Sequence, residues 1–333
     1  MRITVLLGGT SAERDVSLAS GLRIARALRD LGHDVTSLDP ARGVIDESEE
    51  RAMENAGVMK AAPPTLSALE HMTRTSLSPS LGTLPSVRKA DVVFLALHGG
   101  FGEDGTVQAL LDSVGVRYTG SGHMASAIAM DKEISKILFR AANVSTADWM
   151  MAPQSADTVA KTVGFPAVVK PSKQGSTVGL TIVRDPAQLP AAIEEAFRYD
   201  DEVMIERFVP GRELTVGVLG DQAFPVGEIK PVKEIYDYEC KYTAGMATEE
   251  FPAQIPDAVA ERLQREAVRA FQALKLRGCA RIDFRLTDDH EAYCLEANTL
   301  PGMTALSLIP QGAAAAGISF EELCERIVQL SLG

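Results

Sequence analysis

The densest group of potentially reactive side chains lies in the stretch RIDFRLTDDHEAYCLEANTLPGMTALS, residues 281–307. Its polar residues alternate along two predicted strands, as Arg281, Asp283, Arg285, Glu296 and Asn298. Residues two apart in a strand share one face and lie roughly 6.5–7 Å apart. Such a face is ordinarily a solvated outer surface. This one carries short oxygen ligands of the kind that Mg²⁺ prefers, and it runs directly into the turn TLPG. A metal site is therefore the competing interpretation.

A glycine-containing loop is the second candidate. The segment KPSKQGSTVG places Lys170 at a strand end, followed by Gly175, Ser176, Thr177 and Gly179. Glycines let backbone N–H groups approach phosphate oxygens, and hydroxyls add further donors. The loop lacks the residue order of a Walker A motif, and it contains no GxGxxG fingerprint. Taken alone, it is better explained as an ordinary hairpin connection.

Two further residues stand where predicted strands end. Glu13 follows the first strand and begins a predicted helix, where an acidic residue ordinarily complements the helix dipole. His98 ends another strand, in HGGFGEDG, and a lone histidine is usually structural. In parallel sheets, however, ligands bind beyond the carboxyl ends of the strands. Both residues are therefore candidates for ligand contact.

The elements that would position these residues alternate between strand and helix over the first 121 residues. ITVLLGG, DVTSLDP and ADVVFLALHGG have the continuous apolar character of buried parallel strands. Apolar residues recur at helical spacing between residues 18 and 28, before a glycine that can cap the helix. This alternation predicts an α/β fold with a doubly wound parallel sheet. Residues 60–88 are rich in Ser, Thr and Pro and predict a peripheral segment of loops.

The pattern changes near residue 121. MASAIAMDKEISKILFRAAN predicts a helix, and GFPAVVKPSKQGSTVGLTIVRD predicts two strands around the glycine loop. Further strands are predicted in EVMIERFV, ELTVGVLGD and AFPVGEIKP. Residues 232–255 have no clean period and predict a long loop, which in compact domains is often a lid. A helix over roughly residues 256–276, the polar hairpin and two helical stretches complete the chain.

Composition argues against several classes of function. The chain has 33 basic and 45 acidic residues and a net charge of −12, which disfavours nucleic acid or an anionic membrane as a partner. Its four cysteines form no CxxC pair, so we expect buried, reduced thiols in a cytoplasmic protein. No apolar run approaches the roughly 18 residues needed to span a bilayer. The opening MRITVLL lacks the length and cleavage region of a signal peptide.

With these pieces assembled, the sequence resembles the D-alanine–D-alanine ligases of the ATP-grasp superfamily. The resemblance rests on seven motifs in order along the chain: LLGGTSAERDVSLASG, LHGGFGEDGTVQ, YTGSGHMASAIAMDK, KPSKQGSTVG, YDYECKY, RIDF and LEANTLPGMTALS. Residues 41–88 match least well. The resemblance implies three domains: an N-terminal Rossmann-like domain over residues 1–121, a central ATP-grasp lid domain over 122–205, and a C-terminal catalytic domain over 206–333. The last would carry a mobile loop at 232–255.

The resemblance also implies a reaction and its ligands. Two D-alanines would be joined through a D-alanyl phosphate, giving ADP and phosphate, for peptidoglycan precursor synthesis. The residues implied to bind ATP are Lys132, Lys170, Gly175, Ser176, Thr177, Glu206, Arg207, Val209 and Glu213. Two Mg²⁺ ions, for which Mn²⁺ can substitute, would bind Asp283, Glu296 and Asn298, with Glu296 shared between them.

Each chemical step acquires residues by the same resemblance. Lys241 would neutralise charge on the transferring phosphoryl group, and Arg281 with the N–H of Gly302 would stabilise the oxyanion. The residues implied to bind the substrates are Glu13 for the first ammonium, His98 for its carboxylate, and Ser307 with the N–H of Leu308 for the second carboxylate. Glu13, Ser176 and Tyr242 would form a hydrogen-bonded network that latches the lid.

Other interpretations stay open at this point. One is an ATP-grasp ligase with D-lactate or D-serine as its second substrate. Tyr242 speaks against it, because the resemblance implies another residue there, commonly His, in ligases that make D-alanyl-D-lactate. A catalytically silent nucleotide-binding protein is another, although Lys170, Arg281, Asp283 and Glu296 are all present. A dinucleotide-dependent oxidoreductase would need the missing GxGxxG. The resemblance alone suggests a homodimer that binds D-alanine and ATP.

Overall fold

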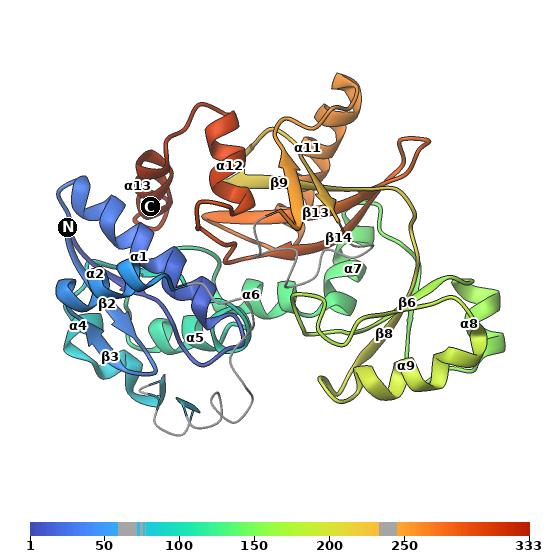
Figure 1. The fold of residues 1–333 in the computed structure, drawn as a ribbon, viewed down its shortest axis with the longest axis horizontal. Helices are drawn as coiled ribbons and strands as arrows, with labels where there is room; N and C mark the ends of the chain where they lie inside the picture. The colour runs from blue at the N-terminus through green and yellow to red at the C-terminus, as the bar shows by residue number, and fades with distance from the viewer. Residues whose placement is uncertain (59–71, 74–75, 77, 233–244) are drawn as a thin grey trace.

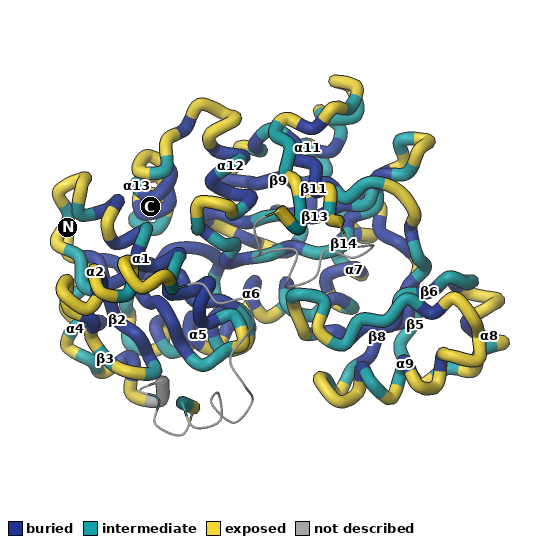
Figure 2. Tube along the Cα trace, viewed as in Figure 1, coloured by how far each residue is buried: buried dark blue, intermediate teal, exposed yellow. Residues whose placement is uncertain are grey.

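The computed structural model describes residues 1–58, 72–73, 76, 78–232 and 245–333. Three β-sheets organise the described residues, and helices pack around them (Figure 1). Buried residues concentrate along the sheets, whereas the outer helices and turns are exposed (Figure 2). The α/β class predicted from the sequence is confirmed. Among the described residues, no helix is long and apolar enough to cross a membrane.

The N-terminal sheet has the strand order β3-β2-β1-β4. Its strands are β1 (Arg2–Leu6), β2 (Asp34–Asp39), β3 (Gly43–Ile45) and β4 (Val92–Leu95). As predicted, β1, β2 and β4 are parallel, whereas β3 is an antiparallel edge strand that the sequence analysis did not identify. The helices of this part are α1 (Arg14–Asp30), α2 (Glu47–Ala56), α4 (Pro85–Arg88) and α5 (Thr106–Ser113), with 3-10 turns at Ser78–Thr83 and Gly100–Gly102.

The central sheet is antiparallel and has the order β5-β8-β6-β7. Its strands are β5 (Trp149–Met151), β6 (Ala167–Pro171), β7 (Thr181–Val183) and β8 (Val203–Arg207). Two helices, α8 (Ala156–Thr162) and α9 (Leu189–Ala196), and a 3-10 turn at Pro186–Gln188 accompany it. Its apolar core draws on residues 150–205 alone. This part therefore has a hydrophobic core of its own.

The C-terminal sheet is also antiparallel, with the order β12-β11-β9-β13-β14 and with β10 paired to β9. Its strands are β9 (Arg212–Leu219), β10 (Gln222–Ala223), β11 (Gly227–Pro231), β12 (Ala247–Glu250), β13 (Cys279–Leu286) and β14 (Ala292–Asn298). The C-terminal part also contains the helices α11 (Asp257–Ala273), α12 (Leu308–Ala315) and α13 (Phe320–Gln329).

Two expectations about elements need correction. The segment predicted as one helix forms two, α6 (His123–Met130) and α7 (Lys132–Ala141), because Asp131 is extended and its carboxylate caps α7 by accepting from the N–H of Ile134. Within the loop predicted over 232–255, β12 pairs antiparallel with β11, and an ion pair joins Lys230 to Glu250 at 2.5 Å. Residues 233–244 lie outside the described residues. The boundaries at residues 121 and 205 stay predictions; α6 and α7 contact β14.

The end of the chain returns to its beginning. Helix α13 lies against α1 (Figure 1), and Ile24, Leu28, Leu323 and Ile327 are buried in one apolar cluster. The same cluster includes residues of the N-terminal sheet and of α12. The N-terminal and C-terminal parts therefore share a core, which fixes the carboxyl ends of the parallel strands relative to the polar hairpin.

Candidate active site

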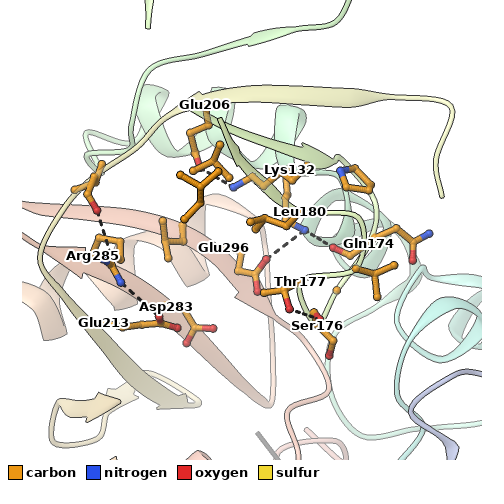
Figure 3. Close-up of a pocket in the computed structure, with 18 of the residues that line it drawn as sticks. Lys132, Gln174, Ser176, Thr177, Leu180, Glu206, Glu213, Asp283, Arg285 and Glu296 are labelled. Atoms are coloured by element: carbon orange, nitrogen blue, oxygen red, sulfur yellow. Dashed lines mark hydrogen bonds and ion pairs between the residues drawn. The ribbon is translucent and has the colours of Figure 1, made fainter. Parts of the chain in front are cut away.

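The polar hairpin and the glycine loop face one cavity of about 170 Å³ between the central and C-terminal sheets (Figure 3). A second, smaller cavity of about 70 Å³ lies next to it, toward the N-terminal part. Gly175, Ser176 and Arg281 line both cavities. Two ligands bound in these cavities would therefore meet at these three residues.

The glycine loop joins β6 to β7 and has an unusual backbone. Ser176 and Thr177 have φ angles of 52° and 59°, and Gly179 has a φ of 69°. A side chain on Gly179 would collide with Tyr199 and Pro171, so glycine is required there. By contrast, a Cβ on Gly175 would meet no protein atom within 4 Å, because this residue faces the open cavity. The backbone at Gly175 is therefore free to approach a ligand closely.

Glu206 lies between two lysines beneath the first cavity. It accepts a hydrogen bond from Lys170 at 2.6 Å and pairs on its other side with Lys136, which is fully buried. Burial disfavours the ionised form of Glu206, but the attraction of the two ammonium groups outweighs it and lowers the pKa of Glu206 to about 2. Lys136 also donates to Thr146, and it lies 5.1 Å from the ring centre of Trp149. Glu206 is thus held as a pure hydrogen-bond acceptor.

The far end of this cavity is held by Arg285. Its guanidinium donates to the carbonyl of Val209 at 3.2 Å and lies 3.5 Å from the carboxylate of Glu213 (Figure 3). It therefore contacts two residues for which the family resemblance implies ATP binding. Arg207 also lines this cavity, 5.0 Å from the ring centre of Tyr293.

The hairpin presents its polar residues as the alternation predicted. Arg281 pairs with Asn298, and Asp283 with Glu296, across β13 and β14. Between the pairs Asp283–Glu296 and Phe284–Cys294, β14 has one extra residue, Leu295, which forms a bulge. Both Leu295 and Glu296 line the cavity, although adjacent residues of a regular strand face opposite ways. The backbone irregularity thus brings an apolar and an acidic side chain to the same site.

The donor set of this hairpin fits a hard divalent cation. Asp283 accepts from Arg281 at 2.8 Å and from the Asn298 amide at 3.0 Å, while Lys132 lies 3.2 Å from Glu296. Two carboxylates and an amide oxygen in one place, surrounded by cations, are the ligands that Mg²⁺ takes alongside phosphates. The described residues contain no group of three or more His, Cys, Asp and Glu that could hold a metal ion, so phosphate or water oxygens would have to complete the coordination.

The second cavity has an acidic and a hydroxyl-bearing side. Glu13 precedes α1 and does not cap it; its carboxylate accepts a hydrogen bond from Ser176 at 2.6 Å, which joins the first strand–helix turn to the glycine loop. Glu103 accepts from the N–H of Gly99 at 2.7 Å. Burial, together with the nearby charge of Glu13, raises the pKa of Glu103 to about 8.

The opposite side of the second cavity is the turn after β14. A Cβ on Gly302 would lie 2.7 Å from the hydroxyl of Ser307, so a side chain at this position would displace that hydroxyl. Ser307 precedes α12 without capping it, and its hydroxyl accepts from the N–H of Thr304 at 3.0 Å. The N-terminus of α12, at Leu308, adds backbone donors and the positive end of a helix dipole. An anion is therefore favoured at this end of the cavity.

His98 is engaged by the protein on both ring nitrogens. Nδ1 lies 2.9 Å from the carbonyl oxygen of Leu300, and Nε2 lies 3.5 Å from the hydroxyl of Ser20. A carbonyl only accepts, so Nδ1 carries the proton. Burial lowers the pKa of His98, which keeps the ring neutral near pH 7.

Every predicted site residue within the described part of the chain lines one of these two cavities. Lys241 and Tyr242 lie outside the described residues. Sequence reasoning missed Lys136, Glu103 and Ser20 as site residues, and it placed Arg285 on the polar face of the hairpin without giving it a role. Among the three missed residues, Lys136 left a usable signal, because it follows Lys132 by one helical turn. The contacts of Ser20 with residue 303 and of Arg285 with residue 209 are distant in sequence.

Comparison with known proteins gives matches over nearly the whole chain. Residues 2–121 match a family model described as "D-ala D-ala ligase N-terminus", and residues 137–329 match one described as "D-ala D-ala ligase C-terminus". A "D-alanine--D-alanine ligase" of Geobacter sulfurreducens is 43% identical over 330 residues, which cover 98% of this chain and 93% of that protein. One from Pediococcus pentosaceus is 43% identical over 341 residues, covering 98% and 97%.

Solved structures agree. The crystal structure of D-alanine–D-alanine ligase from Bacillus anthracis is similar with a TM-score of 0.76 and 33% identity, covering 100% of this chain and 97% of that one. The same enzyme complexed with ATP is similar with a TM-score of 0.76 and 32% identity, with the same coverage. This likeness confirms the predicted three-domain ATP-grasp class of fold.

Proposed function

Because this chain belongs to the D-alanine–D-alanine ligase family, we propose that it joins two D-alanines to D-alanyl-D-alanine at the expense of ATP, for peptidoglycan precursor synthesis. The observation that carries the proposal is the meeting of the two cavities at Gly175, Ser176 and Arg281. One cavity has the cations and acceptors that suit a nucleotide. The other has an acidic group and an anion-binding turn that suit amino acids.

The first step is phosphoryl transfer from ATP to the first D-alanine. Glu206, Arg207, Val209 and Glu213 would hold the base and ribose, and Lys132, Lys170 and residues 175–177 the phosphates. Glu13 would bind the ammonium of the first D-alanine. The carboxylate of this first D-alanine then attacks the γ-phosphorus of ATP, and the bond between that phosphorus and ADP breaks. The products are an acylphosphate and ADP. Both reactants are anionic, so lysines at the cavity wall lower the barrier by neutralising charge. Lys241 is proposed to add a further cation.

Metal ions belong to this proposal as ligands of the hairpin. Asp283, Glu296 and Asn298 would hold two Mg²⁺ ions, for which Mn²⁺ can substitute, with Glu296 shared. When bound, these ions would neutralise charge on the transferring phosphoryl group. Arg281 and Lys132, which pair with Asp283 and Glu296, supply fixed positive charge beside the same carboxylates.

The second step is attack of the second D-alanine's amine on the acyl carbon. Ser307 and the N–H of Leu308 would seat its carboxylate, while Arg281 and the N–H of Gly302 stabilise the oxyanion that forms. The tetrahedral intermediate then collapses, and phosphate leaves with the bonding electrons. The attacking amine gives up a proton, for which Ser176, Tyr242 and the departing phosphate are the candidate acceptors.

The same proposal gives the product. Tyr242 favours an amine nucleophile, so the expected product is the dipeptide rather than D-alanyl-D-lactate. Competition between D-alanine and D-lactate across pH 6–9 tests this choice, and predominant depsipeptide at pH 7.5 contradicts it. We further propose a cytoplasmic homodimer, and sedimentation of the purified protein tests the dimer.

The decisive experiment for the activity measures phosphate release and dipeptide formation from ATP and Mg²⁺, with and without D-alanine. We expect phosphate release that depends on D-alanine and one dipeptide for each phosphate. Binding of ATP without D-alanine-dependent release would instead mean a silent nucleotide-binding protein.

A further inference from the structure

The turn that carries Gly302 is held from outside by the N-terminal part of the molecule. Nδ1 of His98 donates to the carbonyl of Leu300 at 2.9 Å. On the other side of Gly302, the N–H of Met303 donates to the hydroxyl of Ser20 at 3.1 Å, and Arg23 donates to the Met303 carbonyl at 3.0 Å. Three side chains therefore form hydrogen bonds with three backbone atoms, of Leu300 and Met303, on either side of Gly302.

These three side chains are themselves fixed. Ser20 is completely buried on α1, and His98 is 7% exposed at the end of β4. Arg23 lies one helical turn after Ser20, and its guanidinium is 3.5 Å from the ring centre of Phe320 on α13. The hydroxyl of Ser20 and Nε2 of His98 are 3.5 Å apart, which closes the group. We call His98, Ser20 and Arg23 the turn clamp.

The chemistry of His98 separates this role from direct contact with a carboxylate. Its Nδ1–H donates to the carbonyl of Leu300, and Nε2 of the neutral ring carries a lone pair and no proton. A neutral imidazole in this arrangement has no N–H left to donate to a substrate carboxylate. The side chain lines the second cavity, but its polar atoms act on the protein.

We propose that the turn clamp positions the Gly302 N–H as an oxyanion donor, so that the N-terminal part controls the second chemical step without supplying a donor itself. This inference rests on the proposed ligase function. On its other side the turn lies against Ser307, whose hydroxyl would be 2.7 Å from a Cβ on Gly302. The turn is therefore confined from both sides, and removing one side lets the N–H drift from its place.

The two chemical steps depend differently on that N–H. Phosphoryl transfer develops charge at phosphorus, whereas amine attack develops charge on the acyl oxygen. Removing an oxyanion donor outright costs about 100- to 1,000-fold in kcat, so displacing one by loss of a clamp contact should cost roughly 10-fold or more. Acylphosphate formation should change much less.

Ser20→Ala is the test variant, and Ser17→Ala is its matched control. Ser17 lies one turn earlier on α1, is equally buried, and also accepts from a backbone N–H, that of Gly8 at 2.8 Å. Its hydroxyl donates to the Ala96 carbonyl at 2.6 Å and is not part of the turn clamp. Rapid-quench measurements would follow ADP and dipeptide separately in the full-length enzyme with ATP, Mg²⁺ and D-alanine.

The wild type should make ADP and dipeptide in step. Ser20→Ala should give a burst of about one ADP per site, followed by dipeptide formation roughly 10-fold slower than in wild type, with KM for ATP unchanged. Ser17→Ala should show no burst. A Ser20→Ala enzyme that slows both steps equally, or that slows neither, overturns the proposal.

A second pair of variants keeps the test open if Ser20→Ala does not fold. His98→Asn retains an N–H donor for Leu300, whereas His98→Leu retains bulk but no donor. We expect the ADP burst in His98→Leu and its reduction in His98→Asn; equal behaviour of the two variants overturns the role of the Leu300 contact. Failure of the ligase function itself would appear differently, as no D-alanine-dependent ADP in the wild type.

Discussion

Two carboxylates of the site show how the surroundings of a residue set its protonation. Glu206 is held between Lys136 and Lys170, and its pKa falls to about 2 although it is buried. Glu103 has a backbone N–H as its hydrogen-bond donor and the negative charge of Glu13 nearby, and its pKa rises to about 8. The first group is charged at every physiological pH. The second changes charge within that range.

Glu103 should therefore make stability depend on pH. Its folded-state pKa of about 8 lies above its ordinary value of 4.5, so between these values the folded protein binds more protons than the unfolded chain. Stability contributed by this group is highest below pH 4.5 and is lost as the pH rises toward 8. Glu103→Gln has no such dependence. The free energy of unfolding of Glu103→Gln relative to wild type, taken from thermal melts, should therefore rise between pH 5 and pH 8.5 by an amount on the order of 2 kcal/mol after solvent screening.

Glu291→Gln is the control for this measurement, because it makes the same chemical change in an exposed turn. It measures how much of the difference from wild type comes from the amide substitution itself. A Glu103→Gln curve parallel to that of wild type would show that the Glu103 carboxyl titrates normally.

Glu296→Gln should abolish turnover without unfolding the protein. The change removes a proposed shared metal ligand and the ion pair with Lys132 at 3.2 Å. We expect kcat to fall by roughly 1,000-fold or more, because charge on the phosphoryl group would be left poorly neutralised. Steady-state assays with saturating ATP and D-alanine measure it, and circular dichroism checks the fold. Glu291→Gln is again the control, and activity near wild type in Glu296→Gln refutes the metal assignment.

At the scale of elements, patterns that are local in the sequence predicted the strands correctly. The alternation in RIDF and LEAN predicted the hairpin and its shared polar face, and continuous apolar runs predicted β1, β2 and β4. The bulge at Leu295 on β14 left no signal in the sequence, although Leu295 lines the cavity. The break at Asp131 could have been recognised from its capping chemistry. Edge strands such as β12 are short and are stabilised by a partner strand, which a single sequence does not display.

The glycine loop offers a matched pair of substitutions within one element. Gly175→Ala places a methyl group in the open cavity, where no protein atom lies within 4 Å. Gly179→Ala forces an L-residue to a φ of 69° and against Tyr199 and Pro171. The first should raise KM for ATP by about 10-fold and change stability by less than about 0.5 kcal/mol, because only the ligand meets the new group. The second should cost about 1–3 kcal/mol of stability.

The dependence of the rate on ATP concentration measures the effect of Gly175→Ala on KM, and thermal melts measure the loss of stability in Gly179→Ala. Normal ATP binding by Gly175→Ala, or an equal loss of stability in both variants, would contradict these roles of the two glycines.

At the scale of the whole molecule, the site is assembled from three parts that are joined unequally. The N-terminal and C-terminal parts share an apolar core through α1 and α13, whereas the central sheet has its own core. The hydrogen bond between Glu13 and Ser176 then joins the central glycine loop to the N-terminal part. Contacts between residues far apart in the sequence, such as that of His98 with Leu300, could not be derived from one sequence, because they depend on how whole sheets pack.

The shared core predicts that a residue of the last helix stabilises the first sheet. Ile327 is 5% exposed and packs in the cluster that includes Ile24 and Leu28. Ile327→Ala should cost about 2–4 kcal/mol, through lost burial and the cavity it leaves. Leu330→Ala, at a residue 42% exposed at the end of the same helix, should cost less than about 0.5 kcal/mol. Urea denaturation followed by circular dichroism measures both, and similar losses would contradict a shared core.

The position of Trp149 gives the molecule an intrinsic fluorophore. It is the single tryptophan of the chain, on the first strand of the central sheet, with Arg140 at 4.3 Å and Lys136 at 5.1 Å from its ring centre. Lys136 in turn holds Glu206 at the nucleotide cavity. Ligand capture that rearranges this ion pair changes the electric field at the indole, so its emission should report occupancy in the unlabelled protein. Lys136→Met, which leaves the indole in place, should silence that optical response.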